Sequence, residues 1–264
     1  MVVPEPTRLS ALLGGAKALV VGVANEHSIA WGCAKALRRA GTDLALTYLN
    51  DRAKPFVAPL AEKAGAELLL PLDVRDDGQM EAVFADIARR WGRLDVLVHS
   101  IAYAPKPDLQ GRVVDSSTAG FLEALDVSCH SFVRLARHAE PLMRAGGGGT
   151  LVTMTYHGAR TVIPNYGLMA PVKAALEAAV RYLAVELGPA IRVHAVLPGP
   201  LETRAASGLK DFGRLLEAAR ERAPARRTVS IDDVGRAVAF LCSPYARLMT
   251  GETLYVDGGY GLLG

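Results

Sequence analysis

Residues 17–32 read KALVVGVANEHSIAWG and run from the first predicted strand into the first predicted helix. The strand, Lys17–Gly22, is almost wholly apolar, as expected for a strand that is buried on both faces of a parallel sheet. Gly22 ends the strand, and a second glycine, Gly32, lies inside the helical stretch near 28–40. This strand–turn–helix unit is typical of α/β proteins, and it sets the pattern for the rest of the chain.

The alternation of buried strand and helix continues to the far end of the sequence. The further predicted strands are Asp43–Tyr48, Glu67–Leu72, Leu94–His99, Thr150–Thr155, Ile191–Leu197 and Glu252–Val256. The predicted helices lie near 28–40, 54–64, 76–91, 120–145, 166–187 and 231–242. Right-handed crossovers would place these helices on both faces of the sheet. We therefore expect an α/β fold: a single Rossmann-like doubly wound domain over residues 1–264, with a mostly parallel sheet of about seven strands.

Composition excludes several classes of protein. The 264 residues are 50% hydrophobic and 22% charged, which supports a sizeable core and rules out global disorder. No apolar run approaches the ~18–20 residues that span a bilayer, and the N-terminus is a poor signal peptide, so we expect a cytoplasmic protein with no membrane partner. A net charge of +3 is too balanced to indicate a nucleic-acid partner. The three separated cysteines and the scattered histidines favour reduced thiols and no metal site.

Ligands of doubly wound folds bind beyond the carboxyl ends of the strands, so the candidate binding residues lie there. After the first strand, Gly22 would let a pyrophosphate approach the backbone, and the helix N-terminus and the Ser28 hydroxyl would donate to it. A tight turn with Ser28 as an ordinary helix N-cap is the competing interpretation. After the second strand, Leu49 occupies the position where an acidic residue would indicate NAD and an arginine NADP. After the third strand, the Asp73 carboxylate could accept from an adenine amino group, or serve only as a turn residue.

Three polar residues after the fifth strand could carry chemistry: Tyr156, Tyr166 and Lys173. Tyr166 and Lys173 are seven residues apart, which would place both on one face of the predicted helix 166–187. The ammonium could bind ribose hydroxyls and lower the pKa of the tyrosine. The tyrosine hydroxyl could hold an oxygen that becomes negative during hydride addition. From these two residues alone, an exposed lysine on a helix with a packing tyrosine is the simpler explanation.

Four segments read GVANEHSIAWG, HSIAYAP, IPNYGLMAPVKAALEA and GPLETRAASGLKDF. Together they resemble the short-chain dehydrogenase/reductase superfamily and, more narrowly, the bacterial NADH-dependent enoyl-acyl-carrier-protein reductases. The resemblance extends over Lys17–Gly259. Most members of the superfamily have a tyrosine four residues before the lysine, where this chain has Met169. Tyr166, seven residues before the lysine, with Tyr156 ten residues earlier, is instead similar to the enoyl reductase pattern.

This resemblance implies an activity and a set of site residues. The implied reaction transfers a hydride from nicotinamide C4 to Cβ of a trans-2-enoyl thioester in fatty acid biosynthesis. Tyr166 and Lys173 would be the catalytic pair, holding the enolate oxygen and the ribose, and Tyr156 would line the acyl pocket near the thioester. The residues implied to contact the cofactor are Gly22, Ser28, Ile29, Asp73, Val74, Ile101, Lys173 and Thr203.

The resemblance also implies partners. NADH is expected over NADPH because Asp51 lies near the expected ribose and no arginine replaces Leu49, although Arg52 leaves NADPH open. A segment near 200–225 would cover the substrate, and its basic residues Lys210 and Arg214 match positions that face an acyl carrier protein. A CoA thioester is the other open substrate. The family implies a homotetramer.

Two other functions compete with this interpretation. The first is a short-chain carbonyl reductase that acts on 3-oxoacyl thioesters, which Met169 at the usual tyrosine position disfavours. The second is a catalytically silent dinucleotide-binding protein, which the retention of both Tyr166 and Lys173 disfavours. His157, directly after Tyr156, is a further candidate for lining the pocket, with plain packing or solvent exposure as the alternative.

Overall fold

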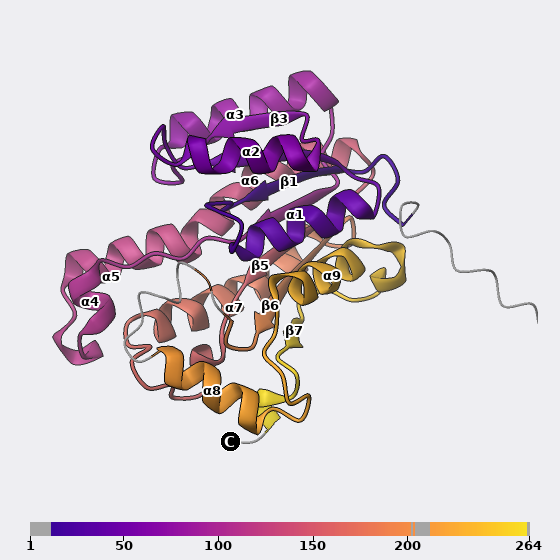
Figure 1. Ribbon diagram of the computed structural model, residues 1–264. Coiled ribbons are helices and arrows are strands. Elements are labelled where there is room, and N and C mark those ends of the chain that lie inside the picture. The colour runs from indigo at the N-terminus through magenta and orange to yellow at the C-terminus, as the bar shows by residue number, and fades with distance from the viewer. Residues whose placement is uncertain (1–11, 202, 204–211, 263–264) are drawn as a thin grey trace, which may run out of the picture.

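The computed structural model describes residues 12–201, 203 and 212–262. Within these residues, one sheet of parallel strands has the order β3-β2-β1-β4-β5-β6-β7 (Figure 1). In chain order the strands are β1 (Lys17–Val21), β2 (Asp43–Tyr48), β3 (Leu68–Pro71), β4 (Val96–His99), β5 (Gly149–Met154), β6 (Ile191–Pro198) and β7 (Thr253–Val256). The expected doubly wound α/β fold is confirmed, and each predicted strand end falls within two residues of the observed one.

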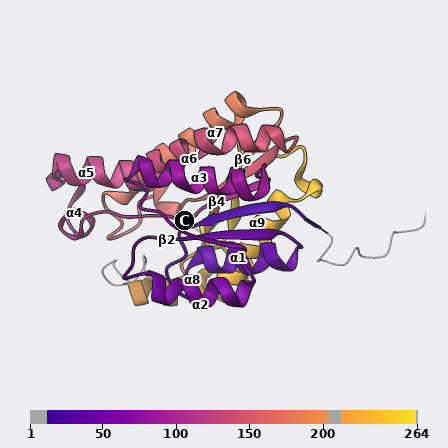
Figure 2. The same cartoon turned by 90° about the horizontal axis from the view of Figure 1, so that it is seen from above.

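Helices cover both faces of the sheet, as Figure 2 shows. One core is formed with α1 (Ile29–Arg39), α2 (Lys54–Ala64) and α9 (Ile231–Cys242), and the other with α3 (Asp77–Trp91), α6 (Ser131–Ala145) and α7 (Met169–Leu187). Successive residues of β1 alternate between the two cores: Leu19 and Val21 enter one, and Ala18 and Val20 enter the other. Burial on both faces explains why the strands read as continuous apolar runs and not as alternating ones.

Two glycines bring the first and last of these long helices into backbone contact. A Cβ on Gly32 of α1 would lie 2.1 Å from the Ile231 carbonyl oxygen, and one on Gly235 of α9 would lie 2.2 Å from the Gly32 carbonyl oxygen. No side chain fits at either position. The glycine that the sequence places inside the first helix, Gly32, is therefore required by helix packing.

Two predicted helices differ from the structure. The stretch 120–145 divides into α5 (Thr118–Leu125), a π-helical turn at Asp126–His130 and α6. The helix predicted for 166–187 begins only at Met169. Asn165 (φ 62°) and Gly167 (φ 48°) adopt left-handed conformations that a right-handed helix cannot contain. The expectation that Tyr166 and Lys173 share a helix face is therefore wrong, since Tyr166 precedes the helix.

Two further helices were not predicted: α4 (Lys106–Gln110) and α8 (Phe212–Arg222). Short 3-10 turns lie at Val113–Asp115, His157–Ala159, Pro244–Ala246 and Tyr260–Leu262. Pro171 is the third residue of α7, where a missing backbone N–H costs the helix no hydrogen bond. Among the described residues, no helix is both long and apolar enough to cross a membrane.

Candidate active site

The strand order reverses direction between β1 and β4, and the candidate residues lie at the carboxyl ends of these strands and their neighbours. Gly22 directly follows β1 with φ 110°, and a Cβ there would lie 2.2 Å from the Ser100 carbonyl oxygen and 3.4 Å from Ile101 Cγ1. The structure thus brings together two residues, Gly22 and Ile101, that lie far apart in the sequence. The glycine is needed for the close approach of the two chain segments.

Ser28 stands at the N-cap position of α1, and its hydroxyl bonds to the loop that precedes the helix. Its Oγ accepts hydrogen bonds from the backbone N–H groups of Ala24 and Asn25, both at 3.0 Å, and donates to Asn25 Oδ1 at 3.3 Å. Its side chain makes no cap hydrogen bond to α1, so the N-cap interpretation is wrong in that respect. The hydroxyl fixes the loop after β1, which leaves the N-terminal N–H groups of α1, beginning at Ile29, as the natural donors to a pyrophosphate.

Asp73 lies in the turn after β3, and its carboxylate already has partners. Arg75 donates to it through its backbone N–H (3.0 Å), Nε (3.0 Å) and Nη2 (2.7 Å). Hydrogen bonding from Arg75 lowers the pKa of the Asp73 carboxyl, so the group is ionised at neutral pH. Val74 between them is buried. An adenine amino group that bound here would have to share the Asp73 carboxylate with the Arg75 guanidinium. The sequence motif did not reveal the contact with Arg75.

Lys173 is a buried ammonium without a carboxylate partner in the described part of the chain. Its side chain is 4% exposed, and Nζ donates one hydrogen bond, to the Met154 carbonyl oxygen at 2.8 Å. Burial lowers the pKa of Lys173 to about 8. A buried cation is costly unless it is paired, and two of the three N–H donors of Nζ have no protein acceptor among the described residues. The chemistry of these donors fits ribose hydroxyls, so Lys173 is a candidate for holding a nicotinamide ribose.

A buried polar network lies at the end of β4 and was not foreseen. His99 is fully buried, with Nδ1 2.8 Å from Thr153 Oγ1 and Nε2 2.9 Å from Ser131 Oγ. Ser131 Oγ donates to the Val127 carbonyl oxygen at 2.7 Å, so it accepts from His99, which places the imidazole proton on Nε2. Burial and the nearby Lys173 lower the pKa of His99 to about 3, which keeps the ring neutral.

The π-helical turn at Asp126–His130 makes part of this network. Ser128 accepts from the Tyr103 N–H at 2.8 Å and donates to the Tyr103 carbonyl oxygen at 2.9 Å, which ties the loop after β4 to the turn. The turn also supplies the Val127 carbonyl oxygen that orients Ser131. Such π turns are frequent at functional sites because they re-aim side chains within a helix.

Tyr156 and Tyr166 are brought together by the two segments that follow β5. Their ring centroids lie 4.9 Å apart at an interplanar angle of 50°. A Cβ on Gly158 would lie 2.1 Å from Cδ1 of Tyr166, so this glycine makes room for the ring. Tyr156 Oη is buried and has no hydrogen-bond partner within the described residues. A buried hydroxyl without a partner is costly, and this makes Tyr156 Oη a candidate position for binding a ligand oxygen.

Burial raises the pKa of both tyrosines, with Tyr260 adding to the effect at Tyr156 and Tyr156 at Tyr166. The expectation that Lys173 lowers the pKa of Tyr166 is therefore wrong: desolvation dominates, and Lys173 is not among the groups that shift it. The consequence is that the Tyr166 hydroxyl keeps its proton at neutral pH and acts as a hydrogen-bond donor.

A charged group on α7, the helix that carries Lys173, was also missed. Glu177 of α7 is 5% exposed and accepts from Thr155 Oγ1 and from Arg160 Nε, both at 2.8 Å. Arg160 in turn donates to the Tyr255 hydroxyl at 2.9 Å. The hydrogen bonds fix α7 to the segment that carries Tyr156. Nothing in the spacing of these residues signalled the contact, because it joins residues of separate elements.

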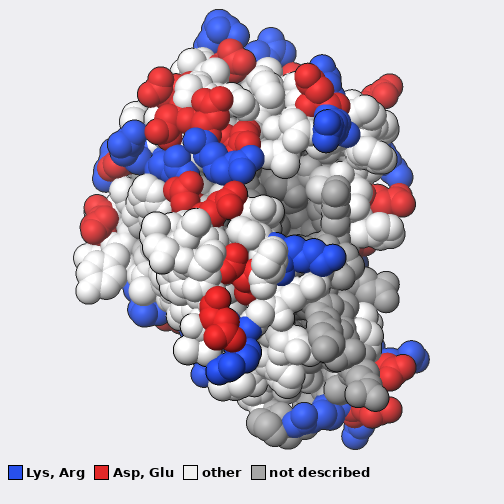
Figure 3. Space-filling model, turned by 90° about the vertical axis from the view of Figure 1, so that its left-hand side faces the viewer, with Lys and Arg blue, Asp and Glu red and all other residues white. Residues whose placement is uncertain are grey.

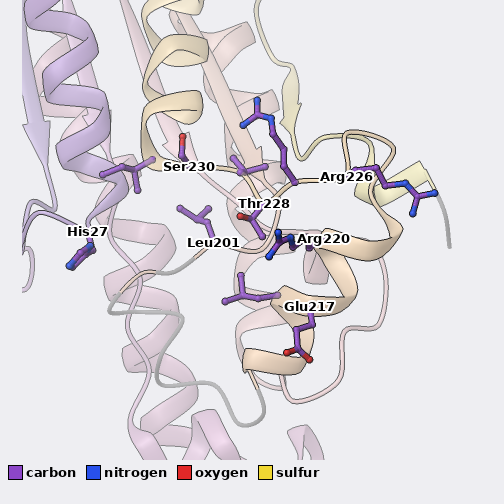
Figure 4. Close-up of a pocket in the computed structure, with 11 residues that line it drawn as sticks. His27, Leu201, Glu217, Arg220, Arg226, Thr228 and Ser230 are labelled. Atoms are coloured by element: carbon purple, nitrogen blue, oxygen red, sulfur yellow. The ribbon is translucent and has the colours of Figure 1, made fainter.

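The covering segment near 200–225 is described in part. Thr203 is half-buried, Lys210 lies outside the described residues, and so does the side chain of Arg214. A cavity of about 590 Å³ lies between α8 and the loop after β1, with Arg220 on one side and His27 on the other (Figure 4). Tyr156, Tyr166 and Lys173 do not line this cavity. Figure 3 shows acidic and basic side chains interspersed on the face over α4 and α5.

Known proteins of one family are similar to this chain over nearly its whole length. A family model described as enoyl-(acyl carrier protein) reductase matches residues 22–261. An enoyl-[acyl-carrier-protein] reductase [NADH] from Rhizobium meliloti is 44% identical over 97% of this chain and 93% of its own length. One from Haemophilus influenzae is 43% identical over 95% of each chain.

Solved structures give the same result. The enzyme from Anaplasma phagocytophilum in complex with NAD is 46% identical, with a TM-score of 0.91 over 96% of each chain. The enzyme from Bacillus cereus with NADP+ and an indole naphthyridinone is 43% identical, with a TM-score of 0.93 over 96% of this chain and 99% of that one. With the family model matching nearly its whole length and with relatives of this identity, the chain belongs to the enoyl-[acyl-carrier-protein] reductase family.

Proposed function

We propose that this chain catalyses the NADH-dependent reduction of the trans-2 double bond of an enoyl thioester carried by an acyl carrier protein, a step of fatty acid biosynthesis. The observation that carries the proposal is the contact between the tilted rings of Tyr156 and Tyr166, with a buried Tyr156 hydroxyl that has no partner among the described residues. Met169 occupies the position of the usual superfamily tyrosine and cannot donate a proton, which disfavours reduction of a ketone.

NADH, when bound, supplies the hydride that adds to Cβ of the substrate. Addition at Cβ moves the π electrons toward the thioester, so negative charge develops on the carbonyl oxygen. Uptake of a proton from solvent at Cα then completes the saturated thioester. Tyr166, whose raised pKa keeps it protonated, donates a hydrogen bond to this oxygen. The Tyr156 hydroxyl lines the acyl pocket beside it. Stabilisation of this kind acts where charge develops and so lowers the barrier more than it tightens substrate binding.

Lys173 holds the nicotinamide ribose through the two N–H groups of Nζ that the protein leaves free in the described structure. The other residues that we assign to the cofactor are Gly22, Ser28, Ile29, Asp73, Val74, Ile101 and Thr203. For Ser28 the assignment is indirect, because its hydroxyl shapes the loop. NADH is favoured over NADPH because Leu49, and not an arginine, directly follows β2 next to the expected ribose.

The remaining parts of the proposal concern the whole protein. We assign residues 1–264 to one reductase domain, with the segment near 200–225 covering the substrate. The family resemblance supports a homotetramer. A cytoplasmic location is supported by the three cysteines, Cys33, Cys129 and Cys242, which are all free thiols.

The test compares crotonyl and acetoacetyl thioesters, on a carrier protein and on CoA, with NADH and NADPH. Oxidation of NADH is expected with the crotonyl substrates, and the acetoacetyl substrates should be essentially untouched. Substantial turnover of the keto substrate would show that the chain is a carbonyl reductase. Cofactor binding without turnover of either class would show a catalytically silent dinucleotide-binding protein.

A further inference from the structure

His157 is a buried histidine that neither the reaction nor the cofactor uses. It directly follows Tyr156, and its side chain is 6% exposed. Nε2 lies 3.0 Å from Oδ2 of Asp257, whose side chain is 7% exposed. The N–H does not align for a full hydrogen bond, so the contact is mainly electrostatic. Because a carboxylate repels a nitrogen lone pair, the imidazole proton belongs on Nε2.

Asp257 organises the turn that ends the described chain. Its Oδ1 accepts from the Gly259 N–H at 2.9 Å, and its Oδ2 accepts from the Gly261 N–H at 2.8 Å. A Cβ on Gly261 would lie 2.3 Å from Cε1 of His157, so the backbone of this turn is seated directly against the imidazole. The turn and the histidine are therefore packed to contact, with one buried carboxylate between them.

The other side of the imidazole contacts the proposed acyl pocket. The rings of His157 and Tyr156 meet edge to face, with centroids 5.9 Å apart, and Tyr156 in turn contacts the Tyr166 ring in a tilted arrangement. Two more tyrosines complete the surroundings of the imidazole, Tyr255 at 5.7 Å and Tyr260 at 5.5 Å. A continuous series of contacts thus runs from Asp257 through His157 to Tyr156.

We propose that His157, held by Asp257, is a positioning residue that couples the C-terminal turn at Asp257–Leu262 to Tyr156 and so fixes the wall of the acyl pocket. This inference rests on the proposed function of Tyr156. The Tyr156 ring contacts His157 on one side and Tyr166 on the other, so it has few orientations. Its hydroxyl is therefore already positioned before the substrate binds. Loss of the contact with His157 should therefore weaken substrate binding and leave cofactor binding and the hydride step nearly unchanged.

Four variants test this coupling. His157→Leu removes both the ring and the N–H, His157→Phe keeps a ring only, His157→Gln keeps an N–H donor only, and Asp257→Asn removes the charge. We expect KM for a crotonyl thioester to rise about 5- to 10-fold in the Leu, Phe and Asn variants, with kcat and the Kd of NADH changed less than about twofold. The Gln variant should raise KM less than the Leu variant does, because it keeps a donor facing Asp257 and loses only the ring contact with Tyr156. The double variant His157→Leu/Asp257→Asn should be no worse than either single variant.

The matched control is His130→Leu, because His130 and Asp126 form a His–Asp contact of the same chemistry on the surface, at 3.4 Å. It should leave KM unchanged. The proposal is overturned if His157→Leu leaves KM at the wild-type value, if Phe restores KM where Gln does not, or if kcat and NADH affinity fall together with KM. Hydrogen exchange gives a readout without substrate: amides 157–161 should exchange faster in Asp257→Asn. A wild-type protein without enoyl turnover would refute the proposed function, and the exchange comparison would still decide the coupling.

Discussion

At the scale of single residues, the surroundings of Lys173 give the clearest indication of a bound ligand. It is a buried cation whose only protein hydrogen bond in the described structure goes to the Met154 carbonyl oxygen. Lys173→Ala should weaken NADH binding by ~10- to 150-fold, because hydrogen bonds to a charged group contribute ~1.5–3 kcal/mol. Fluorescence or calorimetric titration measures this directly. Lys35→Ala is the control, since Lys35 is already paired with Asp232 at 2.5 Å, and it should leave the affinity unchanged.

The same lysine predicts how cofactor binding depends on pH. Burial lowers the pKa of Lys173 to about 8, so the free protein loses this positive charge as the pH rises through that value. The affinity for NADH should be constant below about pH 7 and should decline above about pH 8. Titration between pH 6 and 9 checks this, and the dependence should be missing from Lys173→Ala. A flat profile in the wild type would show that the ammonium does not hold the cofactor.

Residue identities at the strand ends were predictable, but the partners of those residues were not. The sequence placed Gly22, Ser28 and Asp73 correctly after their strands, because strand ends follow from apolar runs. It did not show that Ser28 bonds to its own loop or that Arg75 holds Asp73. Such contacts depend on backbone angles and side-chain rotamers, which spacing does not contain.

At the scale of elements, the contact of α1 with α9 depends on glycine. Gly235→Ala should destabilise the protein by ~1–3 kcal/mol or more, because its Cβ would meet the backbone of Gly32 and not a flexible side chain. The shift in the urea midpoint measures the change. Gly213→Ala in α8 is the control, since a Cβ there has nothing within 4 Å. It should be neutral or stabilise slightly, as alanine favours the helix by up to ~1 kcal/mol. Equal effects of the two substitutions would contradict close packing at the crossing.

Two element boundaries show where periodicity misleads. The predicted helix 120–145 has apolar residues along its whole length, so the pattern alone did not reveal the π turn at Asp126–His130. The predicted helix 166–187 included Tyr166 for the same reason. There the left-handed Asn165 and Gly167 were the available signal, since both residue types favour that conformation. The misplaced helix start made the predicted geometry of Tyr166 relative to Lys173 wrong. The choice of these two residues as the candidate pair did not depend on it.

At the scale of the whole molecule, buried histidines link stability to pH. Burial lowers the pKa of His99 to about 3 and that of His194 to about 4, and it also lowers the pKa of His157. The unfolded chain therefore binds more protons than the folded one below about pH 6.5. The free energy of unfolding should fall as the pH drops from 6.5 to 5, by up to ~1.4 kcal/mol per pH unit for each histidine. Urea unfolding at a series of pH values tests this, and His194→Gln should reduce the slope.

Recognition of the acyl carrier protein also involves the surface of the whole molecule. Acyl carrier proteins are acidic, and rim charges act mainly on encounter rate and are screened by salt. Lys210→Glu with Arg214→Glu should raise KM for a carrier-protein substrate several-fold at low salt, and change KM for the CoA substrate much less. Arg89→Glu with Arg90→Glu, at the end of α3, is the control with the same change in charge. Equal effects on both substrates, or none, would remove this segment from the docking site.

The contact of Gly32 with Gly235 also constrains how the chain folds as it is synthesised. α1 leaves the ribosome early, but the helix that covers its face is α9, which begins only at Ile231. β1 likewise lies beside β2, made soon afterwards, and beside β4, made much later. Pairings this distant in the sequence are slow, and the apolar face of α1 stays open to other chains until they form. A nascent chain that stops before Ile231 therefore has no complete core on that face, and the finished molecule forms only once nearly every residue has been made.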